Sequence, residues 1–567
     1  MLAALTLAGC GFSNSAPYST LRSEVRHIQG VAAQPQSTAV QVERPAQALL
    51  NATRLASYSR ESSYYRSKSG PPKQCVALSG GGIRSAAFSI GVLKALHEKR
   101  LLSTIDVISS VSGGSYAAGW LHAQHIVTGG NRDKVFDEAS LTRLSEKARL
   151  VSLPPMSFLR GVRGAAIWLA HFFNGLAGLT YGGGADPYSW VDGSAAAFEY
   201  EGALTRTFFS SPEGTAVDPF VGDLAPRITE YGLPFLVINT TIGRHSAGDT
   251  PPGAFSKRIF EFTPIRIGAD SVGHFSVSPA DGAPGAPNSS LGTFSLSRVV
   301  RISGAALDAR TAKSVGRRAV TELVEIDLGA EVYLTERSIP NDPPRKAFVY
   351  LSDGGFADNL GAYSAIRRLC GEIVIVDAEF DPTYGFDAYC KLKQALRTEM
   401  HVSFAVDEID KALARSPHPR LVEQQDDSPP SCPSESDFDG SRPVMRGLVE
   451  SFPLAQPASS GKITDHSLDI VYVKLSLDNK EFDDVVVRKT ADRGKLESKY
   501  SANVVEWYAA RKQASGAAVP DFPQLSTVHQ NFTPMQFRAY VDLGYKTVLN
   551  NWGLFEPAAR LSGSKAR

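Results

Sequence analysis

The chain has 567 residues, with 59 lysines and arginines against 58 aspartates and glutamates, so its formal net charge is +1. This balance gives no overall attraction to nucleic acid or anionic lipid, and any partner must therefore be recognised through local chemistry. With 43% hydrophobic residues, 49 glycines and 34 prolines, the composition is that of a folded globular protein with many loops rather than a disordered chain.

The N-terminal stretch is a short apolar run followed by small residues, a cysteine and polar sequence, which is the shape of a shortened export signal. Residues 7–10 read LAGC and resemble the lipobox of bacterial lipoproteins, in which the cysteine is lipidated. We therefore expect residues 1–10 to be a lipoprotein signal and Cys10 to anchor the protein in the bacterial envelope. By the same resemblance to bacterial lipoproteins, Gly11 after the cysteine, rather than an aspartate, favours the outer membrane.

Two features of this stretch keep an alternative open, because the apolar run is short and no lysine or arginine precedes it. A cytoplasmic or secreted protein is that alternative. No later stretch reaches the roughly 18–20 uninterrupted apolar residues of a membrane-spanning helix.

The chain has five cysteines: Cys10, Cys75, Cys370, Cys390 and Cys432. No two of them have the close spacing that zinc sites and redox motifs require, so we expect no structural metal. The last four could form disulfides in an oxidising compartment or remain as free thiols, and the sequence leaves both open.

Residues 11–70 are rich in Ser, Gln and Ala with little apolar periodicity, which predicts a polar tether. Strands and helices then alternate, which predicts an α/β fold with a mainly parallel central sheet between helices over residues 71–400. We expect strands from Cys75 into the following glycines and at 105–111, 233–241, 258–264, 347–353 and 372–379, and helices at 84–100, 115–126 and 360–370.

Residues 153–184 are the most apolar helix-compatible region, interrupted by two arginines and a histidine. They form either a core helix or an interfacial lid. In the lid, these large side chains would meet lipid: Phe158, Ile167, Trp168, Leu169, Phe172 and Phe173. Residues 411–465 are rich in Pro, Ser and Asp, which predicts a loop-rich surface insertion. Residues 466–560, with a strand at 468–477 and a helix at 533–552, should pack on the domain of residues 71–400.

A glycine-rich segment, SGGGIRS at residues 79–85, lies between the first strand and the first helix. Glycines there let backbone N–H groups approach a ligand closely, and the helix N-terminus favours negative charge. A dinucleotide site would need glycine where Ser85 stands and an acid after the second strand, and a P-loop would need Gly-Lys-Ser/Thr. The remaining interpretation is another anion-binding loop, such as an oxyanion hole.

Ser112 lies in SVSGG, where the second strand turns into the next helix. The pattern is that of the G-x-S-x-G nucleophile elbow, with Gly114 in the last position and Ser110 in place of the first glycine. Such a corner lifts the hydroxyl off the sheet edge and points a helix N-terminus at it. Small residues are also common in ordinary strand-to-helix turns, so the motif needs support from elsewhere in the chain.

Asp353 ends a predicted strand in SDGGFADNLG, residues 352–361. Gly354 and Gly355 remove side chains from the turn, so that the carboxylate can meet a neighbouring loop. Asp358 and Asn359 have the simpler interpretation of capping the next helix.

The three motifs, GGGIRS, SVSGG and DGGFADN, occur in the order that is characteristic of the patatin-like phospholipases, and the chain resembles that family over roughly residues 73–400. The resemblance implies a three-layer αβα fold and hydrolysis of phospholipids or other acyl lipids at a membrane surface. From the charge balance and the absence of a D-x-D-x-D-G calcium loop, we expect no cofactor, metal ion or nucleic-acid partner. It implies Ser112 as nucleophile, Asp353 as base and the amides of Gly80, Gly81 and Gly82 as the oxyanion hole.

The resemblance also makes Gly113, Gly114, Gly354 and Gly355 motif glycines. Arg84 follows the glycine loop, where it would either lie near the lipid phosphate or brace the loop. Ser110 departs from the family pattern.

Two other functions remain open. An α/β-hydrolase with a Ser-Asp-His triad is one, and the histidines after Asp353 are His401, His418, His466 and His529. A non-catalytic lipid-binding lipoprotein that keeps the fold is the other.

Overall fold

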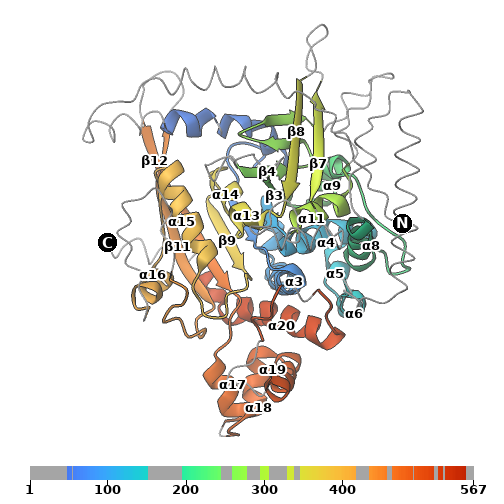
Figure 1. The fold of residues 1–567 in the computed structure, drawn as a ribbon, viewed down its shortest axis with the longest axis vertical. Helices are drawn as coiled ribbons and strands as arrows, with labels where there is room; N and C mark the ends of the chain where they lie inside the picture. Colours follow the sequence, from blue (N-terminus) through green and yellow to red (C-terminus); the bar gives the residue numbers. More distant parts are fainter. Residues whose placement is uncertain are drawn as a thin grey trace, which may run out of the picture.

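The centre of the protein is a mixed sheet of twelve strands whose five middle members run parallel (Figure 1). In spatial order, these five are β12 (Ile463–Lys474), β9 (Glu372–Asp377), β1 (Gln74–Leu78), β2 (Val107–Val111) and β3 (Phe235–Ile242). The computed structural model describes residues 47–53, 55–150, 195–243, 258–276, 294–305, 329–336, 345–416, 433–455, 463–489, 491–515, 522–527 and 530–556. Strands β2, β3 and β9 are buried along their whole length, as parallel strands covered on both faces must be.

Antiparallel strands extend both edges of this parallel centre. Beyond β3 lie β4 (Ile259–Phe262), β5 (Arg266–Ala269) and β6 (Gly273–Ser276), and beyond β12 lie β11 (Val444–Ala455) and β10 (Ser403–Val406). A branch from β3 consists of β8 (Arg345–Ser352) and its partner β7 (Ala330–Glu336). Together with the flanking helices, the sheet confirms the predicted three-layer α/β fold class.

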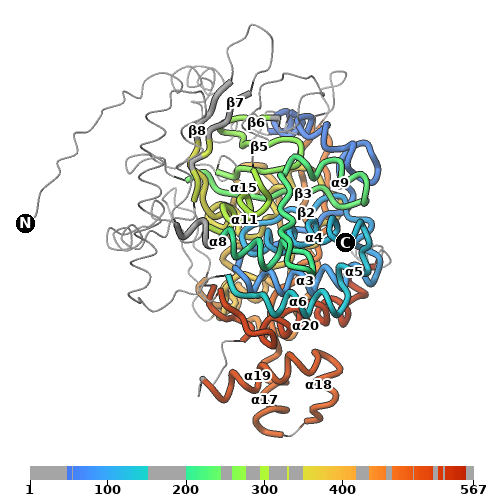
Figure 2. Tube along the Cα trace, turned by 90° about the vertical axis from the view of Figure 1, so that its right-hand side faces the viewer, coloured from blue at the N-terminus to red at the C-terminus, as the bar shows by residue number. Residues whose placement is uncertain are grey.

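Helices pack on the sheet (Figure 2), and the two longest of those described in the first half of the chain follow β1 and β2 directly. They are α3 (Gly82–Glu98) and α4 (Gly113–Val127). Short helices α13 (Gly355–Asp358) and α14 (Tyr363–Ile366) follow β8, and the further helices are α5 (Arg132–Val135), α6 (Glu138–Lys147), α8 (Ala195–Phe208), α9 (Leu224–Tyr231), α11 (Leu296–Ser303), α15 (Asp387–Glu399) and α16 (Asp407–Ala414).

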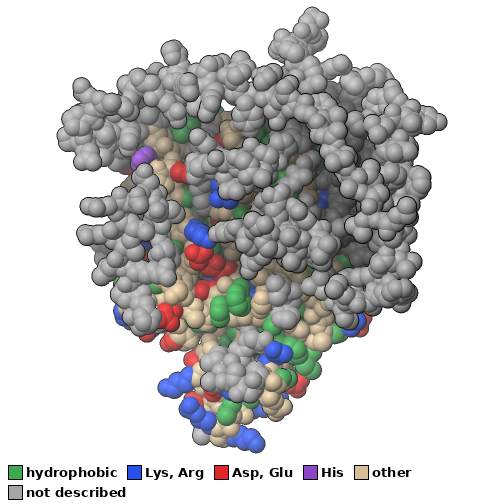
Figure 3. Space-filling model, in the orientation of Figure 1, with side chains coloured by type: hydrophobic (Ala, Val, Ile, Leu, Met, Phe, Trp, Pro, Cys, Tyr) green, Lys and Arg blue, Asp and Glu red, His purple; other side chains and the backbone are tan. Residues whose placement is uncertain are grey.

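The C-terminal helix α20 (Pro534–Asn550) packs along α3. Glycines make this approach close, because a Cβ built on Gly91 would lie 1.9 Å from the Val541 carbonyl oxygen, and one on Gly544 2.2 Å from that of Phe88. Helices α17 (Asn479–Val486), α18 (Arg493–Tyr500) and α19 (Ala502–Ser515) lie below α20 at the bottom of both views (Figures 1 and 2). On the face in Figure 3, this end of the molecule carries basic and acidic side chains side by side.

The sheet extends beyond residue 400, where we expected the catalytic domain to end. Strand β11 lies inside the range 411–465 that was expected to be loop, and β12 then enters the centre of the sheet beside β9. Pro453 and the irregular register between Val449 and Phe452 interrupt the regular strand pattern of β11, which is why the sequence did not indicate a strand there. The first half of β12 is largely exposed, which is why its apolar pattern begins only at Leu468.

The polar tether that we expected over residues 11–70 ends sooner, because a buried charge fixes its last part to the body. Glu61, in the 3-10 helix η1 (Ser59–Tyr64), is fully buried and accepts from Arg368 Nε at 2.7 Å and Arg266 Nε at 2.9 Å. Burial raises the pKa of Glu61, but these two guanidiniums outweigh it and hold the pKa below its ordinary value. The partners lie more than 200 residues away in the chain, so local sequence does not reveal them.

A disulfide joins Cys75 at the start of β1 to Cys370 before β9, and Cys390 is also disulfide-bonded. For these three cysteines the structure has bridges rather than free thiols. Cys10, Cys432 and the apolar region 153–184 lie outside the described residues, so their roles stay predictions. Within the described ranges, no helix is both long and apolar enough to cross a membrane.

Replacement of Glu61 by alanine tests the buried charge cluster. Glu61→Ala leaves Arg368 with one carboxylate fewer in a site without solvent, so we expect a loss of about 3–5 kcal/mol in the free energy of unfolding. The control is Glu138→Ala, because Glu138 pairs with Arg538 at the surface and should cost less than about 1 kcal/mol. Urea unfolding measures both, and similar losses in the two variants would contradict the buried anchor.

Candidate active site

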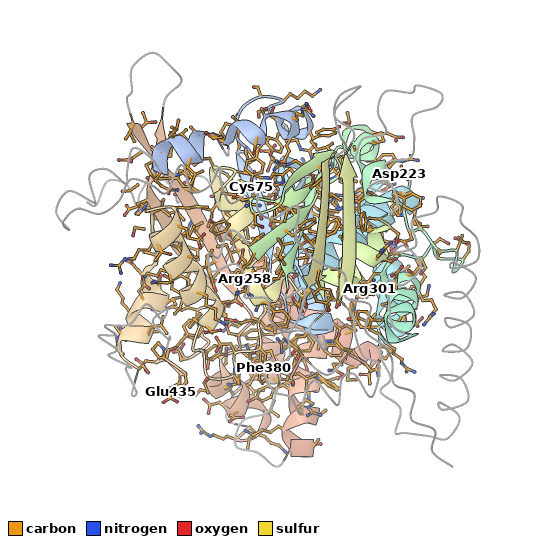
Figure 4. All side chains as sticks on the ribbon, turned by 45° about the horizontal axis from the view of Figure 1, so that its top comes forward. Cys75, Asp223, Arg258, Arg301, Phe380 and Glu435 are labelled. Atoms are coloured by element: carbon orange, nitrogen blue, oxygen red, sulfur yellow. A yellow bond between two sulfur atoms is a disulfide. The ribbon has the colours of Figure 1, made fainter. Side chains whose placement is uncertain are left out.

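The three sequence motifs meet at one edge of the sheet, where the parallel strands end. The glycine loop follows β1, Ser112 follows β2, and Phe380 comes shortly after β9. Cys75, near the start of β1, and Phe380 lie at opposite ends of the sheet (Figure 4). Asp353 follows β8, whose last residue pairs with Thr241 at the end of β3. The sheet thus brings together residues from positions 80 to 380 of the chain.

Ser112 occupies a strained corner between β2 and α4, with φ 50° and ψ −122°. A side chain rarely adopts this backbone conformation, which costs on the order of 1–3 kcal/mol. The Ser112 N–H donates to Ser303 Oγ at 2.8 Å, and Ser303 Oγ donates to the Asn239 carbonyl oxygen at 2.7 Å. Ser303 in α11 thereby fixes the strained peptide to β3, a contact that the sequence motifs did not reveal.

The two glycines after Ser112 permit close backbone contact with the neighbouring loop. A Cβ on Gly113 would lie 2.0 Å from the Gly82 carbonyl oxygen, and one on Gly114 would lie 2.3 Å from that of Leu78. Any larger residue would push the elbow away from the glycine loop.

Ser112 and Asp353 face each other, as the resemblance implied. Ser112 Oγ lies 3.4 Å from Asp353 Oδ2, and both side chains are almost completely buried. The other carboxylate oxygen of Asp353, Oδ1, accepts from the Gly355 N–H at 2.7 Å. Gly354 is required on the same turn, because a Cβ there would lie 2.4 Å from the Asn239 carbonyl oxygen. One oxygen of Asp353 is therefore anchored by the turn, and the other is directed at the serine.

The glycine loop differs from the expected set of three equivalent donors. Gly80 N–H donates to the Asn359 carbonyl oxygen at 2.8 Å, so the loop fold already uses it. Gly81 and Gly82 have positive φ values of 137° and 61°, and their N–H groups have no hydrogen-bond acceptor among the described residues. Two of the three predicted oxyanion donors, Gly81 and Gly82, thus remain available.

Arg84 is buried and braces the loop rather than facing solvent. Its Nη2 donates to the Ala378 carbonyl oxygen at 2.9 Å, and Nη1 donates to that of Leu525. The guanidinium also lies 5.7 Å from the centre of the Phe380 ring. Burial lowers the pKa of Arg84 to about 10. Of its two predicted roles, this geometry fits bracing.

Ser110, which stands where the elbow motif has glycine, causes no conflict. It lies within β2, where its Oγ donates to the Val237 carbonyl oxygen at 3.3 Å and accepts from Ser115 Oγ at 3.2 Å. The hydroxyl therefore joins the polar network beneath Ser112.

The histidines of the triad alternative are only partly described. His401 and His466 are exposed, and His466 Nε2 lies 3.2 Å from Thr464 Oγ1. His418 and His529 lie outside the described residues. A role for His418 or His529 in a Ser-Asp-His triad therefore stays a hypothesis.

An acidic cluster that we did not predict lies beside the site. Asp377 and Asp381 each accept from Lys474 Nζ at 2.9 Å, and Glu379 Oε1 lies 3.5 Å from the same nitrogen. Burial, together with Asp377, raises the pKa of Glu379 to about 8. The lysine ammonium takes the central place among these carboxylates. No group of three or more His, Cys, Asp or Glu within the described ranges is arranged to hold a metal ion.

Residues 76–270 match the family model described as patatin-like phospholipase. No curated protein matches the chain. Among solved structures, the chain is similar to human GIVD cytosolic phospholipase A2, with a TM-score of 0.47 and 14% identity over 91% of this chain and 64% of that chain. The chain thus spans less than two thirds of that relative.

A second solved structure of the human enzyme, in complex with methyl gamma-linolenyl fluorophosphonate, has a TM-score of 0.46 and 13% identity over 91% of this chain and 63% of that one. VipD from Legionella pneumophila has a TM-score of 0.21 and 14% identity over 59% of this chain and 56% of its own.

Replacement of Ser303 by alanine tests the support beneath the elbow. Ser303→Ala leaves the buried Ser112 N–H without its acceptor, so we expect a loss of about 1–3 kcal/mol in the free energy of unfolding. The matched control is Ser103→Ala, because Ser103 is an exposed serine that bonds only within its own turn. Chemical denaturation of both variants measures the difference, and equal stabilities would rule out the supporting role.

Proposed function

Residues 76–270 are a patatin-like phospholipase domain, and on this premise we propose that the protein is a lipid acyl hydrolase that cleaves carboxylic esters of phospholipids. The observation that carries the proposal is the pair formed by Ser112 and Asp353, 3.4 Å apart, beside the unbonded amides of Gly81 and Gly82. A nucleophile, a base and donors for an oxyanion are the parts that acyl transfer requires.

In the first half of the reaction, Ser112 Oγ passes its proton to Asp353 Oδ2 and attacks the ester carbonyl carbon. The carbonyl oxygen becomes an oxyanion, which the Gly81 and Gly82 amides stabilise, each donor contributing on the order of 3 kcal/mol. The intermediate then breaks its bond to the leaving oxygen, which takes the proton from Asp353. The products are the lysolipid alcohol and an acyl ester on Ser112.

In the second half, water passes a proton to Asp353 and attacks the acyl ester through a second oxyanion. The fatty acid leaves, and Ser112 Oγ recovers the proton. An ordinary aspartate with a pKa of about 3.9 is a poor base toward a hydroxyl, so the carboxylate must be desolvated and held against the serine. The burial of Asp353 and its bond from Gly355 support that role.

Exposed aromatic side chains support a lipid as the substrate. Phe356 lies three residues after Asp353, Phe380 lies over Arg84, and about half of each side chain is exposed. Apolar area of this kind at the mouth of a site suits an acyl chain at a membrane surface. The apolar region 153–184 would add to this face if it acts as a lid.

We also propose that the protein is a lipoprotein of the bacterial envelope, anchored through Cys10. The disulfide between Cys75 and Cys370 supports an oxidising compartment, because such bridges rarely persist in the cytoplasm. A cytoplasmic or secreted protein remains the alternative.

Replacement of the proposed nucleophile and base tests the reaction. Ser112→Ala and Asp353→Asn should each abolish release of fatty acid from mixed phospholipid vesicles, measured by mass spectrometry. The double variant should lose little more, because the two groups act as one unit. Full activity in either single variant would contradict the dyad, and its loss on replacement of His401, His418, His466 or His529 would favour a triad. Wild-type protein that neither hydrolyses lipid nor reacts with a fluorophosphonate would favour a non-catalytic module.

Removal of the proposed lipid anchor tests the location. Each buried CH₂ of a lipid chain contributes about 0.8 kcal/mol, so two or three chains on Cys10 would hold the protein firmly on a membrane. Cys10→Ser, expressed with its natural upstream sequence, should move the protein from the membrane fraction to the soluble fraction. Protein that stays membrane-bound, or a mature chain that still carries Met1, would contradict the anchor.

A further inference from the structure

The side chain of Asn359 lies between the glycine loop and the Ser112–Asp353 pair. A Cβ built on Gly80 would be 2.2 Å from Asn359 Oδ1 and 3.3 Å from Ser112 Cβ. A Cβ built on Gly355 would be 2.7 Å from the same Oδ1 and 3.1 Å from Asp353 Oδ1. The absence of side chains at Gly80 and Gly355 therefore makes room for this carboxamide beside the reacting groups.

The hydrogen bonds that hold this turn together do not involve the Asn359 side chain. The backbone carbonyl oxygen of Asn359 accepts the Gly80 N–H, and the neighbouring Asp358 carboxylate accepts the N–H groups of Leu360 at 3.2 Å and Tyr363 at 2.8 Å. Asp358 is thus the cap that we expected from the sequence. The expectation that Asn359 also caps the next helix is wrong.

The Asn359 carboxamide, half-buried, makes no hydrogen bond to any other residue in the part of the chain that the structure describes. The oxygen and the NH₂ group of the carboxamide exchange places when the side chain rotates by half a turn about its Cβ–Cγ bond. The amide NH₂ can therefore face the site. A polar group in this position gains a partner when an ester enters the site. During acyl transfer, negative charge develops on the ester carbonyl oxygen.

The glycine loop provides room for such a donor. Gly80 N–H is bound to the Asn359 backbone, which leaves Gly81 and Gly82 as backbone donors. We propose that Asn359 is a further catalytic residue, whose side-chain N–H donates to the ester carbonyl oxygen of the bound acyl lipid and to the oxyanion formed from it. This inference rests on the proposed function, since it assigns a role within the same reaction.

The test uses the full chain and a soluble short-chain nitrophenyl ester, which avoids effects of lipid aggregation. Asn359→Ala removes the donor. Asn359→Asp keeps the shape of the side chain but replaces the amide NH₂ with a carboxylate oxygen, which accepts. Loss of one oxyanion donor should lower kcat by about 10²–10³-fold with little change in KM. The matched control is Asn131→Ala, because Asn131 is an exposed asparagine that caps α5 and should leave kcat unchanged.

Two further measurements separate donation to the oxyanion from a structural effect. Affinity for a trifluoromethyl ketone, which forms a tetrahedral oxyanion with the serine, should fall by the same factor as kcat/KM in both Asn359 variants. The melting temperature should stay at the wild-type value, because the backbone carbonyl still binds Gly80.

The outcomes distinguish this proposal from the proposed function. Wild-type protein that hydrolyses the ester in a Ser112-dependent manner, with Asn359→Ala within threefold of it, overturns the role of Asn359 and leaves the function standing. Lower kcat with unchanged ketone affinity also overturns the role. Wild-type protein without Ser112-dependent hydrolysis overturns both.

Discussion

The site depends on direct contact between two stretches of backbone. These are the glycine loop after β1 and the elbow after β2. The strands are parallel neighbours, so their ends turn toward the same edge and their connecting loops must share one small space. Only the backbone atoms of Gly82 and Gly113 occupy this space, because neither residue has a side chain. Because the loops are this close, the hydroxyl of Ser112 and the amides of Gly81 and Gly82 face one shared space.

The strained backbone of Ser112 is stable because polar groups on other elements satisfy it. Ser303 accepts its N–H, and Asn239 links Ser303 to β2 by donating from Nδ2 to Ser109 Oγ at 2.9 Å and to the Ser110 carbonyl oxygen at 3.0 Å. Buried polar groups that all have partners fix one geometry, whereas an apolar core could shift. The position of Ser112 is thus set by β2, β3 and α11 together.

Buried charges extend this order to parts of the chain far from the motifs. Glu61 fixes the N-terminal segment through Arg368, and Lys474 fixes β12 to the end of β9 through Asp377. Arg84 reaches from the glycine loop to the carbonyl of Leu525, near the C-terminal helix. Residues before 71 and after 400 therefore belong to the folded body around the candidate site, which is not limited to the range between them.

The sequence by itself determined the features that follow from local pattern: the strand-to-helix corners at the glycine loop and Ser112, the turn at Asp353, and the α/β class of the fold. Turn residues and apolar periodicity act over a few positions, so they can be recognised without knowledge of the rest of the chain. The tertiary structure decided which groups these residues meet. The Gly80 amide binds Asn359, Ser303 supports Ser112, and Cys75 pairs with Cys370, in each case across 190 to 295 positions. Such pairings depend on strand order and on which side chains share a buried space, and neither is present in a local pattern.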